Sequence, residues 1–95
     1  MPSILKIEGG KMKVICIYED NHGLIGVAKD YTSAIEYLIE ETDWLDENEI
    51  TDEGLSVREK FGENWTEPIY NLEMCEFNDL FFGRFSLEER EVYPW

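Results

Sequence analysis

Two short apolar runs near the N-terminus, separated by turn-forming residues, are the first regular pattern in the chain. Residues 13–18 read KVICIY and residues 24–28 read LIGVA, and both are rich in β-branched side chains. The cluster between them contains Asn21 and Gly23, two residue types that tolerate the positive φ angles of tight turns. This arrangement predicts a β-hairpin.

A helical pattern follows the hairpin. Ser33 and Glu36 fit the S-x-x-E capping box, and Asp30 and Thr32 are alternative caps. Because a two-stranded ribbon is only marginally stable alone, we expect the apolar face of this helix to lie on the hairpin. The residues of that face recur at near-helical spacing: Tyr31, Ala34, Ile35, Leu38, Ile39, Thr42 and Leu45.

A polar loop is expected over residues 46–54, and a short helix after it. This helix would start at Ser56, whose partner Glu59 completes a second capping box, and stop at Gly62. Its buried residues would be Leu55, Val57 and Phe61.

The C-terminal third predicts one further helix and a final strand. Residues 69–82 carry a helical stripe that Gly83 would end, formed by Tyr70, Met74, Phe77 and Phe81. Residues 84–93 alternate between apolar and charged side chains, as a half-buried strand does.

The order of these elements predicts a single α+β domain over residues 12–95. A three-stranded antiparallel sheet, made of the N-terminal hairpin and the C-terminal strand, would be covered on one face by two or three helices. Residues 1–11 stand apart, either as a flexible N-terminus or with an edge strand at residues 4–7. Met12 directly precedes the first strand, so residues 1–11 could also be a translated leader ahead of a native start at Met12.

Composition narrows the classes of partner. The chain has 22 acidic and 8 basic residues and a net charge of −14, which repels nucleic acid and anionic membranes. No apolar stretch reaches the roughly 18 residues that span a bilayer, and the N-terminus lacks the apolar run of a secretion signal. We expect a cytoplasmic protein in which Cys16 and Cys75 are buried free thiols.

Little in the chain favours catalysis or metal binding. His22, the only histidine, lies in the predicted hairpin turn, and Cys75 sits beside Glu76, which disfavours a reactive thiolate. An EF-hand loop starting at Asp46 fails at three required positions, which hold Ile50, Thr51 and Val57. No Cys or His spacing suits zinc. We therefore expect a non-enzymatic protein without metal or cofactor.

Two segments of the sequence resemble a known group of proteins. The opening KVICIYEDNHGLIGVAKDY with AIEYLIE, and the closing EFNDLFFGRFSLEEREVY, resemble short uncharacterised proteins of phages and prophages of Gram-positive bacteria. The resemblance covers residues 12–93 and implies a cytoplasmic phage accessory protein. Such proteins carry no assigned activity, and small acidic ones often act by binding and blocking a host protein.

Negative charge is concentrated in an acidic band, residues 30–57, which holds ten acids and no base. Glu36, Glu40, Asp43 and Glu47 would line one side of the predicted helix if it extends that far. Stabilising helix faces usually alternate signs, and carboxylates near a helix C-terminus oppose the helix dipole. The band could be a solvated face that keeps the protein soluble, but its cost in stability favours a binding role.

The leading hypothesis is therefore an inhibitor that blocks a basic nucleic-acid-handling host protein by DNA mimicry. Trp44 would either anchor that interface or pack at the helix end. The predicted contacts are Glu36, Glu40, Glu41, Asp43, Trp44, Asp46, Glu47, Glu49, Asp52 and Glu53.

An alternative is a small assembly or adaptor module that uses its aromatic C-terminal part. The last predicted strand would be an exposed sheet edge, which favours pairing and so a homodimer. The contact residues in that case would be Phe81, Phe82, Tyr93 and Trp95.

Overall fold

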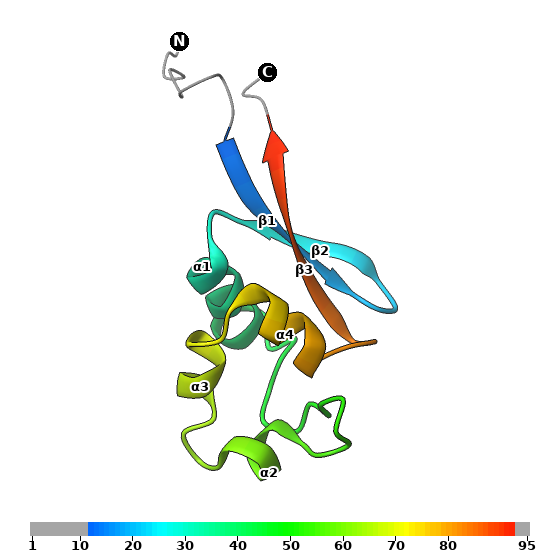
Figure 1. Ribbon diagram of the computed structural model, residues 1–95, viewed down its shortest axis with the longest axis vertical. Helices are drawn as coiled ribbons and strands as arrows, with labels where there is room; N and C mark the ends of the chain where they lie inside the picture. Colours follow the sequence, from blue (N-terminus) through cyan, green and yellow to red (C-terminus); the bar gives the residue numbers. More distant parts are fainter. Residues whose placement is uncertain (1–11, 93–95) are drawn as a thin grey trace.

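The computed structural model describes residues 12–92, which form a three-stranded antiparallel sheet and helices packed against it (Figure 1). Strand β1 (Met12–Glu19) lies between β2 (Gly23–Ala28) and β3 (Phe85–Val92). The predicted hairpin, final strand and α+β class are thus confirmed. The expectations for residues 1–11 lie outside the described residues.

The strand register assigns the two faces of the sheet. Ile17 pairs with Gly26 on one side and with Leu87 on the other, and paired residues of antiparallel strands share a face. Ile17 and Leu87 are buried in the core, so this face meets the helices. On the opposite face Leu24 and Val27 remain 55% and 57% exposed, so the helices cover one face only.

The first helical segment is shorter than predicted. Helix α1 (Tyr31–Glu36) continues into one wider π-helical stretch, η3 (Tyr37–Glu41). Thr42 ends it, and the amide and hydroxyl of Thr42 both donate to the carbonyl of Tyr37, at 3.1 and 2.8 Å. Asp43 follows in the left-handed region with a φ of 62°, which turns the chain away from the helix axis.

The N-terminal cap of α1 is Asp30 and not Ser33. Asp30 has extended backbone angles, and its carboxylate accepts a hydrogen bond of 2.8 Å from the amide of Ser33. That hydrogen bond also lowers the pKa of Asp30, because it stabilises the ionised carboxylate. The capping box predicted for Ser33 and Glu36 is therefore wrong, and the alternative cap is the correct one.

Helix α2 (Val57–Phe61) confirms the prediction for residues 56–62. Ser56 and Glu59 form both hydrogen bonds of the capping box, and Gly62 ends the helix with a φ of 86°. Val57 is fully buried as expected. Leu55 is not, since 42% of it is exposed where the loop turns back.

The single helix predicted over residues 69–82 is two helices. Helix α3 (Thr66–Tyr70) ends at Asn71, and α4 (Met74–Leu80) starts after Glu73. Glu73 and Glu76 form a capping box, which supplies a new helix start in the middle of the apolar stripe.

The core fills the space between the helix-facing side of the sheet and the helices. It joins every helical segment to β1 and β3, and Phe77 and Phe81 of the C-terminal stripe are fully buried in it. The fully buried large side chains are Phe77, Phe81, Ile17, Ile35, Leu38, Leu45, Ile69 and Val57.

Close approach of η3 to β2 requires a glycine at position 26. The ring of Tyr37 lies over Gly26, and a Cβ atom there would come within 2.7 Å of the ring. The Tyr37 hydroxyl donates a hydrogen bond of 2.6 Å to the carbonyl of Ile25, which fixes the ring in this place.

The outer edge of β3 is closed along its first half. The Asn78 side-chain amide donates to the carbonyl of Leu87 at 2.9 Å, and its oxygen accepts from the Leu87 amide at 2.7 Å. The amide of Phe85 donates to the carbonyl of Phe81 at 3.0 Å. These contacts occupy backbone groups through which another strand would pair.

Candidate protein-interaction surface

The structure divides the acidic band into two parts that differ in their partners. The carboxylates at residues 47–53 lie in a loop that folds back on itself through an isolated bridge between Ile50 and Ser56. Thr51 is buried in this loop, where its amide and its hydroxyl both donate to the carbonyl of Leu55. Asp30 caps α1, and the other carboxylates before residue 47 belong to α1, η3 and the turn that follows.

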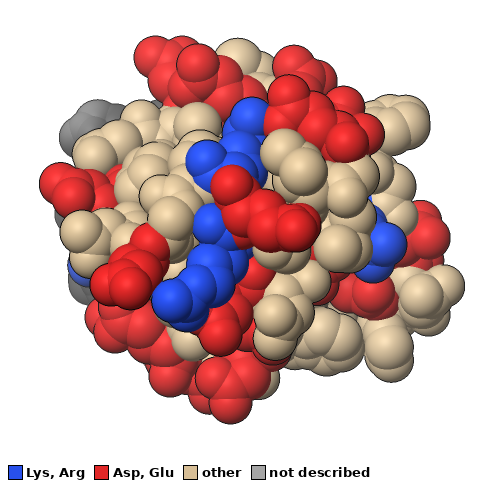
Figure 2. Space-filling view, turned by 90° about the horizontal axis from the view of Figure 1, so that it is seen from below, with Lys and Arg blue, Asp and Glu red and all other residues tan. Residues whose placement is uncertain are grey.

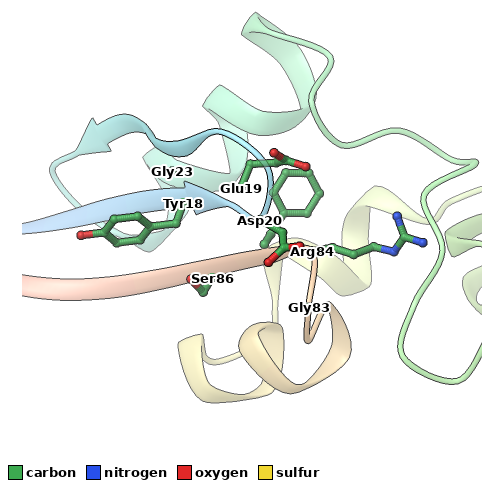
Figure 3. Close-up of a pocket in the computed structure, with 8 residues that line it drawn as sticks. Tyr18, Glu19, Asp20, Gly23, Gly83, Arg84 and Ser86 are labelled. Carbon is green, nitrogen blue, oxygen red and sulfur yellow. The ribbon is translucent and has the colours of Figure 1, made fainter.

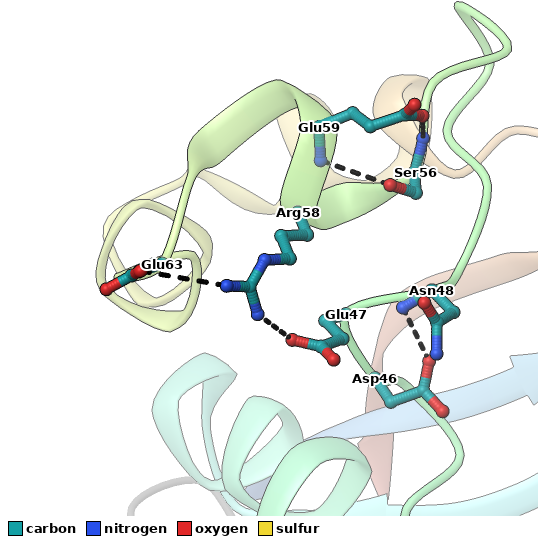
Figure 4. A network of polar contacts seen from close by, with 7 residues as sticks. All are labelled: Asp46, Glu47, Asn48, Ser56, Arg58, Glu59 and Glu63. Carbon is teal, nitrogen blue, oxygen red and sulfur yellow. Dashed lines mark hydrogen bonds and ion pairs between the residues drawn. The ribbon is translucent and has the colours of Figure 1, made fainter.

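Basic residues from outside the band pair with three of the four loop carboxylates. The guanidinium of Arg58 contacts the carboxylates of Glu47 at 2.7 Å and Glu63 at 3.8 Å (Figure 4). Lys60 pairs with Glu53 at 2.5 Å. Both bases belong to α2, which directly follows the loop. Seen from below, basic side chains lie in the middle of the face with acidic side chains around them (Figure 2).

Glu49 is the most enclosed carboxylate of the loop. It pairs with Arg84 at 3.2 Å, and its side chain is only 18% exposed. Burial raises the pKa of Glu49, and the guanidinium of Arg84 opposes that effect without cancelling it. The expectation that the band lacks neutralising bases is therefore wrong for Glu47, Glu49 and Glu53, which have structural partners.

The carboxylates from residue 36 to residue 46 form what we call the acidic surface. Within residues 12–92, no lysine or arginine forms an ion pair with any of them. They are not aligned along one helix as predicted, because the helix ends at Glu41. The members of this surface are all exposed: Glu36, Glu40, Glu41, Asp43 and Asp46.

Two members of the acidic surface have polar partners other than bases. Glu40 accepts a hydrogen bond of 2.7 Å from the hydroxyl of Tyr70 on α3. Burial, together with this contact, raises the pKa of Tyr70 to about 12. The carboxylate of Asp46 accepts a hydrogen bond of 2.8 Å from the backbone amide of Asn48 (Figure 4). The contact from Tyr70 joins η3 to α3, a connection that the sequence pattern does not reveal.

Trp44 packs against the core at the end of the helix. It is partly buried, and its ring meets the imidazole of His22 edge-on, with centroids 5.0 Å apart. Nδ1 of His22 lies 2.7 Å from Oε1 of Glu19, and this hydrogen bond lowers the pKa of Glu19. The two rings join the hairpin turn to the start of the acidic loop.

A hollow of about 340 Å³ lies where the hairpin turn meets the start of β3. Figure 3 shows that Tyr18 and Arg84 point in opposite directions from it. Arg84 extends to its ion pair with Glu49, which is not part of the lining. Tyr18 and Arg84 therefore do not converge on one point, as the groups of a catalytic site do.

In each of two pairs, the cysteines and the adjacent residues Phe81 and Phe82, one side chain is buried and the other is exposed. Cys16 is buried, as expected, but Cys75 is exposed on α4, so its predicted packing role is wrong; both thiols are free. Phe81 is a core residue, which excludes it as a partner contact, while Phe82 is 78% exposed. Tyr93 and Trp95 of the alternative hypothesis lie outside the described residues.

Comparison with known proteins adds no relative: no family model, curated protein or solved structure matches this chain. In the described part of the chain, no three His, Cys, Asp or Glu side chains gather in a way that could hold a metal ion. Across residues 12–92, none of the helices has the length and apolar character needed to cross a membrane. The acidic surface is the candidate interaction surface of the described residues.

Proposed function

We propose that this protein is a non-enzymatic acidic binding protein that blocks a basic nucleic-acid-handling protein. The acidic surface would take the place of nucleic-acid phosphates in the partner's basic groove, in the manner of a DNA mimic. The resemblance to phage proteins supports a host protein as the target.

One observation carries the proposal: among residues 12–92, three of the four loop carboxylates pair with a base, whereas none of the acidic surface does. Arg58, Lys60 and Arg84 each pair with a carboxylate of the loop. The five carboxylates of the acidic surface have no such partner within residues 12–92. Unpaired carboxylates near the end of a helical segment oppose its dipole by roughly 0.3–1 kcal/mol each at low salt. A binding role explains why they are kept.

The experiment compares a charge-reversed variant with a matched control. Glu36→Lys/Glu41→Lys changes two exposed carboxylates of the acidic surface. Glu67→Lys/Glu89→Lys makes the same change in net charge at exposed positions elsewhere. Glu47 and Glu49 are left intact because their reversal would break ion pairs of the loop.

Each immobilised protein is incubated with bacterial lysate at low and at high salt, with and without competing DNA. We expect the parent and the control to retain a nucleic-acid-binding protein that salt and DNA release. The acidic-surface variant should lose it. Equal retention by both variants would refute the proposal, and so would a partner that resists both salt and DNA.

A further inference from the structure

A groove with a volume of about 400 Å³ lies between the acidic loop, α2 and α4. It is separate from the acidic surface, and it brings together side chains that are distant in the sequence. Its lining combines two kinds of chemistry, an apolar floor and a charged rim.

The floor consists of Phe61, Leu72 and Leu80, each partly buried and packed against the core. A hydrogen bond of 2.8 Å from the amide of Asp52 to the carbonyl of Leu80 holds the loop on the end of α4. The floor of the groove therefore continues the hydrophobic core.

The rim carries four carboxylates and one base. Asp52 and Glu53 come from the loop, Glu76 and Asp79 from α4, and Lys60 from α2. The charge of this rim is therefore strongly negative around an apolar floor. Neither Asp52 nor Asp79 forms an ion pair with a base in the part of the chain that the structure describes.

Lys60 shows how the groove accommodates a cation. Its ammonium contacts the carboxylate of Glu53 and lies 5.6 Å from the ring centroid of Phe61. A cation over an aromatic ring and beside a carboxylate is stabilised by both. The same combination of apolar and acidic groups continues past Lys60 to Leu72, Asp52 and Asp79.

We propose that this groove binds one lysine or arginine side chain of a basic partner protein. The aliphatic stem would lie on Phe61, Leu72 and Leu80, and the cationic head between Asp52 and Asp79. An anionic group is repelled by the rim, and a purely apolar side chain leaves the carboxylates without a counter-charge. The inference rests on the proposed function, because the partner is the same basic protein.

The test uses two cationic peptides of equal charge and different stem length. Hexalysine and hexa-2,4-diaminobutyric acid are titrated into isotopically labelled protein, and binding is followed by the NMR shifts of backbone amides. Asp52→Asn/Asp79→Asn removes two groove carboxylates, and Glu36→Gln/Glu41→Gln makes the same charge change on the acidic surface. All four residues are exposed, so both variants should fold.

We expect hexalysine to bind about fivefold to tenfold more tightly than the short-stem peptide, because its longer stem buries more apolar surface. Shifts should centre on Phe61, Leu72 and Leu80. The groove variant should bind hexalysine roughly tenfold more weakly than the parent. The acidic-surface variant should change this affinity far less.

Three outcomes would overturn the inference. If both peptides bind equally and both variants weaken binding alike, attraction is only general electrostatics, and the proposed function remains. If the shifts centre on η3 and only the acidic-surface variant weakens binding, the acidic surface alone receives the partner. Absence of any binding to the parent protein at low salt would overturn both proposals.

Discussion

His22 occupies the tip of the hairpin between two groups of different character. One side of its imidazole contacts the carboxylate of Glu19, and its ring meets the edge of Trp44. Asn21 adds a backbone hydrogen bond of 2.8 Å to the same carboxylate. The histidine thus has a structural role in the turn, where its contacts account for its presence.

The pKa of Glu19 gives the first prediction. This pKa lies below the ordinary value of 4.5, and the hydrogen bond from His22 is the largest cause. The associated stability is therefore present above about pH 4.5 and is lost as pH falls through the folded-state pKa. We expect His22→Ala to raise the pKa of Glu19 towards 4.5, as measured by NMR titration of its side-chain carboxyl. An unchanged midpoint in the variant would show that the imidazole does not stabilise the carboxylate.

The ends of the helices depend on single capping side chains. Asp30 caps α1, and Ser56 caps α2 within a complete capping box. Each satisfies a backbone amide that has no partner within its helix.

The second prediction compares these caps by urea unfolding. Ser56→Ala and Asp30→Ala should each lower the free energy of unfolding by about 1 kcal/mol, because an amide loses its acceptor. Ser33→Ala is the control, and its cost should be clearly smaller, since the carboxylate of Asp30 is the cap. A larger loss for Ser33→Ala than for Asp30→Ala would contradict this assignment.

The edge of β3 gives the third prediction. Asn78→Leu removes both hydrogen bonds to the backbone of Leu87. We expect the free energy of unfolding to fall by about 1–3 kcal/mol, because the backbone groups lose their partners. Asn78→Asp keeps the acceptor and loses the donor, so its stability should lie between those of the parent and the leucine variant.

The same variants report on the edge itself. Amide exchange at Leu87 should accelerate in Asn78→Leu, and sedimentation should show more self-association, because the strand edge becomes available. Parent-like exchange together with parent-like unfolding would mean that Asn78 does not close this edge.

Local patterns in the sequence predict the elements whose ends are set by neighbouring residues. The hairpin and α2 have their turn or cap residues beside them, as Gly23, Ser56 and Gly62 show. The pattern predicts a first helix that is too long, because Leu45 is buried but lies outside the helix. Its amide donates to the carbonyl of Leu38 from a chain that has already turned at Asp43. Periodicity alone cannot distinguish this return from another helical turn.

The whole molecule carries its charge unevenly. It has 22 acidic and 8 basic residues, and several of those bases are engaged in holding the acidic loop. Repulsion among the remaining carboxylates should therefore oppose folding more than the exposed ion pairs favour it.

Salt dependence is the fourth prediction. Raising sodium chloride from low to moderate concentration should increase the free energy of unfolding by about 1–2 kcal/mol, because screening weakens the repulsion. Urea unfolding at each salt concentration measures it. Glu36→Lys/Glu41→Lys should depend less on salt, since each substitution removes a negative charge and adds a positive one. Loss of stability with added salt would mean that ion pairs dominate.

The sequence predicts only part of the candidate site, because ion pairs between distant residues depend on the fold. The sequence places ten acids together, but the partners of the loop carboxylates are fixed by the fold. Arg84 is 35 positions from Glu49, and Arg58 is 11 positions from Glu47. The nearness of Arg58 and Lys60 to the band becomes informative only once the loop is known to fold back. Nothing in the local pattern indicates that α4 and the loop form a groove.

The contact between Gly26 and Tyr37 has a consequence for how this fold can diverge. The ring leaves no room for a side chain at position 26, and a smaller residue at position 37 would release that constraint. In distant relatives the two positions should change together, so that a glycine accompanies an aromatic residue and a larger residue accompanies a smaller one. A pairing of this kind would persist after the surface residues had diverged beyond recognition.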